Sequence, residues 1–347
     1  MNIKNYDIYL SRTTSALCLF LILSEANVWL NPINNTLLVL GYRLFIIFTP
    51  LFFIVFKHRL SFIAFILAEL GITAWIYNYL LTGTLLFSIG IAISGYMLKY
   101  YSSFTTKGAA GNKIALNIGS IFSGLIVAMF HNIKFILIFC LIITATSFFS
   151  FFKYYCRENL SQLTTEKSHF KFNKIFSPMG IAWASIGFVI GVKLIAIVSI
   201  LPQFIMQNNA GHLPAWFGGM LIFNSLFVVL FQIPIMNTVK KFNKIQSLLP
   251  LILAMIVISF SYAFGVSSLY GALVWTLCLS IVECAVSFLD KLSQDDGFLL
   301  IKEISVGLGS AATVLCIRTF SPQTGSTIIG SVSLLLLGIS ILIFHCN

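Results

Sequence analysis

Charge is scarce in this sequence. Only 9% of its 347 residues are Asp, Glu, Lys or Arg, while 59% are hydrophobic. Soluble domains carry charge on about a quarter of their residues. Acids are the rarest, with 10 Asp and Glu against 21 Lys and Arg. This composition excludes an ordinary water-soluble domain and indicates a chain whose solvent is mostly lipid.

Catalytic and metal-binding motifs are also missing. The sequence contains no HExxH, CxxC, nucleophile-elbow or phosphate-loop pattern, and each of these patterns sets reactive or ligating groups at a spacing that the chemistry requires. Its five histidines and seven cysteines show no ligand-type spacing. We therefore expect no enzymatic activity, no cofactor, no metal and free thiols. Without a soluble domain to hold ATP, we do not expect an ATP-driven pump.

Long apolar runs fill the chain instead. A helix needs about 20 largely apolar residues to cross the hydrocarbon core of a bilayer. The sequence predicts an all-α membrane protein with twelve transmembrane helices, at residues 13–31, 36–56, 60–81, 83–99, 113–130, 133–152, 177–205, 215–237, 246–265, 267–288, 298–317 and 325–345.

The basic residues fall in alternate gaps between these runs. Seventeen of the 21 Lys and Arg, beginning with Lys4 and Arg12 before the first run, lie on one side of the predicted membrane. By the positive-inside rule this side is cytoplasmic, together with both termini. The net charge of +11 is therefore a topology signal, and we expect no nucleic-acid partner.

The longest polar stretch divides the chain into two halves. It covers residues 153–176 and predicts a cytoplasmic connector between two six-helix bundles, 1–152 and 177–347. Parallel repeats of this kind are a common plan of secondary transporters. The halves are weakly similar, since KGAAGNKIALNIGS (107–120) resembles DGFLLIKEISVGLGS (296–310), with Gly119 matching Gly309 to within one residue.

Two segments resemble the major facilitator superfamily of transporters. The stretch GGMLIFNSLFVVLFQIPIMNTVKKF (218–242) is similar to the eighth span of that superfamily, and TTKGAAGNKIALNIGSIFSG (105–124) to the loop into its fifth span. The resemblance implies two six-helix bundles that rock around a mid-membrane cavity, lined chiefly by spans one, four, seven and ten.

Apart from the pair at the start of the eleventh span, five charged residues lie more than one turn from either end of a predicted span, and such residues are costly enough to count as site candidates. Glu25, Lys193 and Glu283 fall on spans one, seven and ten, which the resemblance makes cavity-lining. For Arg43, a structural ion pair with Glu25 is as good an interpretation as a substrate contact. Glu69 is better explained by structural pairing or by a position at the lipid interface. Burial favours a protonated carboxyl and a nearby Lys favours the carboxylate, so these acids are candidates for proton coupling.

Uncharged polar residues complete the candidate list. Asn117, Asn224 and Gln232 lie within spans and either contact a solute or join helices by hydrogen bonds, the latter being common in membranes. Pro50 falls late in its span and predicts a bend. Lys302 and Glu303 lie about one turn inside the eleventh span, and we expect them to pair with Asp290 or Asp295 near the cytoplasmic end.

Together these patterns predict a monomeric secondary transporter in a bacterial inner membrane. It would move a small organic solute, with a carboxylate-bearing one such as an organic acid or siderophore preferred, by alternating access driven by a proton gradient. An exporter of drugs or amphipathic solutes is an alternative. The turn FKHRLS (56–61) lacks the Gly and the acid usual in the superfamily, so a non-transporting assembly or scaffold protein on a decayed transporter fold is another.

Overall fold

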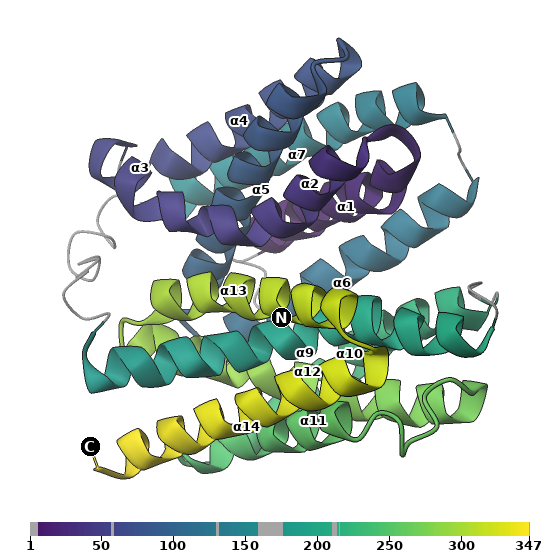
Figure 1. Ribbon diagram of the computed structural model, residues 1–347. Helices are drawn as coiled ribbons and strands as arrows, with labels where there is room; N and C mark the ends of the chain where they lie inside the picture. The colour runs from purple at the N-terminus through teal and green to yellow at the C-terminus, as the bar shows by residue number, and fades with distance from the viewer. Residues whose placement is uncertain are drawn as a thin grey trace. The chain divides into compact units, whose positions relative to one another are not determined.

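The computed structural model describes residues 6–56, 59–129, 132–158, 176–209, 214 and 216–346. All regular structure within these ranges is helical (Figure 1). The chain forms two compact units, Met1–Lys171 and Phe172–Asn347, called unit 1 and unit 2 below. Each is described by itself.

The described residues of unit 1 form six apolar helical rods, one of which is interrupted. The second rod consists of α2, the 3₁₀ helix η2 and α3 in succession, and η2 ends two residues before Pro50, whose ring removes a backbone donor. The predicted bend near Pro50 thus coincides with a change of helix type. The elements are α1 (Tyr6–Trp29), α2 (Pro32–Leu44), η2 (Phe45–Phe48), α3 (Thr49–Phe56), α4 (Leu60–Ile76), α5 (Leu80–Ser102), α6 (Thr106–Met129) and α7 (Ile133–Glu158).

Unit 2 also contains six rods. Its first helix begins at an N-cap, where the Ser177 side chain accepts a hydrogen bond from the Gly180 amide and Pro178 occupies the first turn, as both residue types favour. The elements are α9 (Pro178–Asn208), α10 (Trp216–Val239), the 3₁₀ helix η5 (Gln246–Leu248) with α11 (Leu249–Ser259), α12 (Leu269–Asp295), α13 (Leu299–Thr319) and α14 (Pro322–Cys346).

Ten helices in the described residues are long and apolar enough to cross a membrane, so the chain is an integral membrane protein. The third and ninth predicted spans are shorter than expected, at Leu60–Ile76 and Gln246–Ser259. The third span ends before Asn78, which has a positive φ of 65°. The ninth span is followed by turns that include Gly265 at φ 60°. Both turns contain residues that the apolar pattern had assigned to a helix.

Other helix ends also differ from the prediction. Helix α1 begins at Tyr6, so Arg12 lies inside the first helix and not before it. The Arg12 guanidinium approaches the Gly95 carbonyl oxygen at 3.5 Å. Helix α7 continues to Glu158, into the predicted connector. The rest of the connector up to residue 175, Lys57 in the basic turn and Lys4 lie outside the described residues.

The two units use the same helix pairings. In each unit, the first rod packs on the fifth and sixth rods. The fourth rod packs on the second and third rods, and the third rod also packs on the sixth. These pairs are α1 with α6 and α7, α5 with α2 and α4, and α4 with α7 in unit 1, and α9 with α13 and α14, α12 with α10 and α11, and α11 with α14 in unit 2. This shared scheme agrees with the weak internal similarity of the sequence.

Glycines bring the first and fifth rods of each unit close together. In unit 2, a Cβ on Gly191 would lie 2.1 Å from the Val306 carbonyl oxygen, and one on Gly309 would lie 2.0 Å from that of Phe188. In unit 1, a Cβ on Gly119 would lie 2.5 Å from the Thr13 carbonyl oxygen. Because lipid gives helices no hydrophobic reason to associate, such close backbone approach holds them together. The matched Gly119 and Gly309 therefore perform the same packing role.

Small polar side chains join α1 to α7 in unit 1. The Ser11 hydroxyl donates to the Ser147 carbonyl oxygen at 2.8 Å, and the Thr14 and Ser147 hydroxyl oxygens are 2.6 Å apart. One turn further on, the Thr144 hydroxyl lies 3.4 Å from Cys18 Sγ. Their three- and four-residue spacings place these groups on facing stripes of the two helices.

Candidate functional site

Lys193 is the most deeply buried charge in the centre of a described helix. It lies midway along α9 and its exposed fraction is 0%. Gly187 and Gly191 fix one face of α9 against α13. A helix turns by about 100° per residue, so Lys193, two residues after Gly191, lies about 200° from it around the α9 axis. Because Gly191 faces α13, Lys193 lies on the opposite side of α9.

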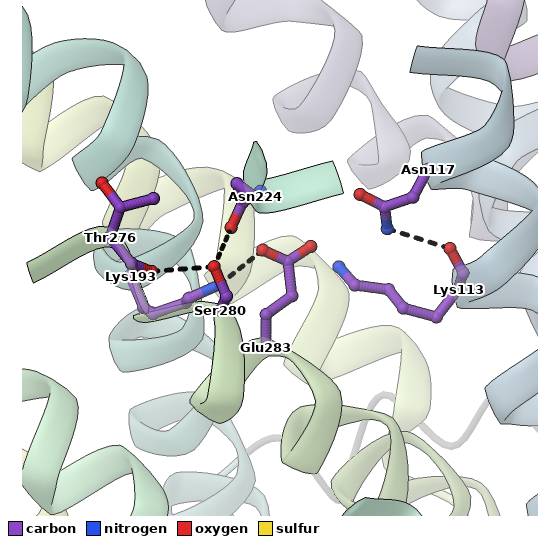
Figure 2. A network of polar contacts seen from close by, with 7 residues as sticks. All are labelled: Lys113, Asn117, Lys193, Asn224, Thr276, Ser280 and Glu283. Carbon is purple, nitrogen blue, oxygen red and sulfur yellow. Dashed lines mark hydrogen bonds and ion pairs between the residues drawn. The ribbon is translucent and has the colours of Figure 1, made fainter. Parts of the chain in front are cut away.

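Glu283, on α12, is the partner of Lys193. The Lys193 Nζ lies 2.6 Å from Glu283 Oε2 (Figure 2). The Glu283 side chain is only 7% exposed. Removing two charges from water costs several kcal/mol per ion, so a buried ion pair is weak evidence for stability. Inside a membrane helix it is evidence for a functional site.

Asn224 and Gln232, both on α10, connect that helix to α12 near the ion pair. The Ser280 hydroxyl lies 2.8 Å from both Asn224 Oδ1 and the Thr276 carbonyl oxygen, and donates to one of them at a time (Figure 2). Gln232 Nε2 donates to the carbonyl oxygen of Cys284 at 2.8 Å. Both amides thus bridge helices, one of the two roles that the sequence left open.

Several buried oxygens around this part of α12 have no hydrogen-bond partner among the described residues. They are Gln232 Oε1, Thr276 Oγ1 and Ser287 Oγ. All three residues are at most 1% exposed. A buried polar atom left unpaired costs about 1–3 kcal/mol, so these oxygens are places where a bound solute or a proton would be stabilised.

The candidates in unit 1 do not form a comparable group. Glu25 is buried on α1, 8% exposed, and has no hydrogen bond or ion pair with any described residue. The suggested ion pair between Glu25 and Arg43 is therefore absent, and the Arg43 guanidinium lies 5.3 Å from the Tyr42 ring centre. Asn117 Nδ2 donates to the Lys113 carbonyl oxygen of its own helix at 3.0 Å (Figure 2).

Two further groups of charges extend beyond the predicted candidates, and one of them is fully buried. Asp7, 6% exposed, lies 2.9 Å from Arg157 and 3.9 Å from Lys153. This contact was not predicted, because α1 and α7 both extend beyond their predicted spans. Lys302 pairs with Asp290 and Glu303, which confirms the expected contact with Asp290. The described residues contain no group of three or more His, Cys, Asp or Glu that could hold a metal ion.

The two units and their repeated helix pairings are consistent with the fold of two six-helix bundles that the sequence resemblance implied. No protein-family model matches the sequence, and no curated protein matches it. The fold is nevertheless shared with solved transporters over almost the whole chain.

Three solved structures illustrate this similarity. The human organic anion transporter MFSD10 (TETRAN) has a TM-score of 0.67 and 11% identity, covering 98% of this chain and 100% of that one. A bacterial homologue of the iron transporter ferroportin, in an outward-facing state, has a TM-score of 0.68 and 11% identity, covering 100% and 99%. A POT family transporter in complex with a thioalcohol-conjugated peptide has a TM-score of 0.66 and 12% identity, covering 99% and 95%. These neighbours are transporters and not enzymes.

Proposed function

We propose that this chain is a secondary active transporter that moves a small organic solute across a bacterial inner membrane by alternating access. The observation that carries the proposal is the buried Lys193–Glu283 pair, 2.6 Å between Nζ and Oε2, beside buried oxygens that lack partners among the described residues. A membrane protein maintains such a costly group where it binds or moves something polar.

The proposed mechanism uses the two units as rocking halves. The six rods of each unit, including the two short ones, form twelve spans in two bundles, 1–152 and 177–347, joined by a cytoplasmic connector. The charge distribution supports cytoplasmic termini, because 17 of 21 basic residues lie in the gaps assigned to that side or in the helix ends next to them, as the positive-inside rule requires. A monomer suffices for this mechanism.

The ion pair explains how a carboxylate-bearing solute would be coupled to protons. The solute carboxylate takes the place of Glu283 beside Lys193, and Glu283, now buried without its cation, accepts a proton because burial disfavours its charged form. Release of the solute returns Glu283 to Lys193 and expels the proton. Solute and proton therefore move together. The unpaired oxygens of Gln232 and Thr276 would accept hydrogen bonds from the solute.

The test is uptake by proteoliposomes that contain the full chain, under an imposed pH gradient. The probes are a panel of radiolabelled monocarboxylic and dicarboxylic acids and one lipophilic cation. We expect acid uptake to be lost in Lys193→Ala and in Glu283→Gln, and retained in Lys241→Ala, a matched control because Lys241 is exposed.

Two results would overturn parts of the proposal. If both site variants insert correctly and transport the acids at the wild-type rate, the ion pair is not the solute site. If only the lipophilic cation is transported, the carboxylate assignment is wrong and a drug exporter is the better description. No transport of any probe, with correct insertion, would favour the scaffold interpretation.

A further inference from the structure

Two amide side chains of α10 contact α12 on either side of Glu283. The Ser280 hydroxyl, three residues before Glu283, donates to Asn224 Oδ1 at 2.8 Å. The Cys284 carbonyl oxygen, in the residue after Glu283, accepts a hydrogen bond from Gln232 Nε2 at 2.8 Å. Three residues rise about 4.5 Å along a helix, so both contacts lie within one turn of Glu283. These two residues of α10 therefore adjoin the part of α12 that carries the ion pair.

The contact with Cys284 fixes the orientation of the Gln232 amide. A backbone carbonyl oxygen only accepts hydrogen bonds, so the amide nitrogen must face it and the amide oxygen must face away. Gln232 is 0% exposed, and its Oε1 has no hydrogen-bond partner among the described residues. An amide oxygen also only accepts. The group that completes the hydrogen bonding of Gln232 must therefore be a donor.

The Ser280 hydroxyl has one hydrogen for two acceptors. Asn224 Oδ1 and the Thr276 carbonyl oxygen both lie 2.8 Å from it (Figure 2). Whenever Ser280 donates to Thr276, it leaves Asn224 Oδ1 to another donor. The Asn224 side chain is partly exposed, so an entering molecule can reach it. Both amides of α10 thus offer an oxygen to a donor from the solute.

A carboxylate alone does not supply this donor, because an ionised carboxyl group only accepts hydrogen bonds. An ammonium group on the solute would donate, but the Lys193 ammonium would repel it. In the proposed mechanism Glu283 is protonated when the solute binds, so it would not balance a second positive charge. A neutral hydroxyl donates without adding charge. It is the group that fits an amide oxygen beside a lysine.

We propose that the solute is a hydroxycarboxylate, whose carboxylate binds Lys193 and whose hydroxyl donates to Gln232 Oε1, with Asn224 Oδ1 as a further acceptor. The inference rests on the proposed function and names the substrate class of that site. Gln232 then determines specificity, because an acid without the hydroxyl leaves Oε1 buried and unpaired. That loss corresponds to binding that is weaker by about 5-fold to 150-fold.

Equilibrium binding to the purified full chain in detergent tests the substrate class without any transport step. The probes are two matched pairs, β-hydroxybutyrate with butyrate and malate with succinate, and also β-aminobutyrate. We expect each hydroxy acid to bind about 5-fold to 150-fold more tightly than its partner, and β-aminobutyrate to bind more weakly than β-hydroxybutyrate. Equal affinities within both pairs, or tighter binding of the amino acid, would overturn the inference and leave the transport proposal standing. If none of the acids binds, both proposals fail.

Variants of Gln232 and Ser280 test the assignment of the hydroxyl. Gln232→Met has a similar volume and no amide oxygen, so we expect it to lose the preference for hydroxy acids but to bind butyrate and succinate as the wild type does. Its unfolding temperature should not fall, because a buried acceptor without a partner is removed.

Two further variants separate specificity from structure. Gln207→Met is the matched control, since Gln207 is exposed on α9, and it should keep the preference. Ser280→Ala removes the donor that competes for Asn224 Oδ1, so the preference should be at least as large as in the wild type. A preference that persists in Gln232→Met, or that is lost equally in Gln232→Met and Ser280→Ala, would refute the inference.

Discussion

The Lys193–Glu283 ion pair predicts a stability effect that can be worked out from its geometry. At 2.6 Å, two opposite unit charges attract by about 6 kcal/mol at an effective dielectric constant of about 20. Desolvation of the two ions costs several kcal/mol each, so the pair contributes little net stability. Removing one residue of the pair is different, because the other charge stays buried and loses its ion-pair partner, at a cost of about 3–5 kcal/mol.

A double-mutant cycle separates the net contribution of the ion pair from the cost of removing one partner. We expect Lys193→Met to lower the free energy of unfolding by about 3–5 kcal/mol, and Glu283→Gln to lower it by a similar amount. The double variant Lys193→Met/Glu283→Gln should be more stable than either single one, because no charge is left unpaired. The assay is reversible unfolding of the full chain in mixed micelles, followed by the fluorescence of its five tryptophans.

The cycle has a clear control and a clear refutation. Lys241→Met, at an exposed lysine, should change stability by less than about 0.5 kcal/mol. If the two single effects add to within about 0.5 kcal/mol in the double variant, the residues do not interact, and the site must be abandoned.

The apolar pattern predicts the rods well because lipid leaves a spanning backbone no choice but to bond internally. It predicts their ends less well, since hydropathy marks where lipid ends and not where the helix ends. Helix α12 continues to Asp295, beyond the predicted limit at 288, and α7 continues beyond 152. Asp7 and Arg157 were missed for this reason, since both lie on helical turns outside the apolar runs.

Charged residues form ion pairs according to which helices are neighbours in the fold, and the composition of the sequence does not specify the neighbours. Asp290 and Lys302 could be matched from the sequence because only a short turn separates α12 from α13. The pairing of Lys193 with Glu283 joins α9 to α12, and both residues were candidates without an assigned partner. The Glu25–Arg43 pair was suggested because both residues were expected in the outer part of neighbouring helices, and the pair does not form. Whether these residues bind solute stays a prediction.

Two further predictions concern packing within each unit. Alanine in place of a glycine in a helix stabilises by about 0.5–1 kcal/mol where the added Cβ has room, and we expect this for Gly338→Ala, where an added Cβ meets nothing within 4 Å. In Gly309→Ala the new Cβ would lie 2.0 Å from the Phe188 carbonyl oxygen, so α13 must move away from α9 and stability should fall by about 1–3 kcal/mol; equal effects at both sites would refute the close approach. In unit 1, Ser147→Ala should lower the free energy of unfolding by about 0.6 kcal/mol, the average for hydrogen bonds between membrane helices. The control Ser24→Ala should leave it unchanged, because the exposed Ser24 hydroxyl donates only to a carbonyl oxygen of its own helix. The same micelle unfolding assay measures both, and a null result at Ser147 would mean that its 2.6 Å contact with α1 contributes nothing to the association of α1 with α7.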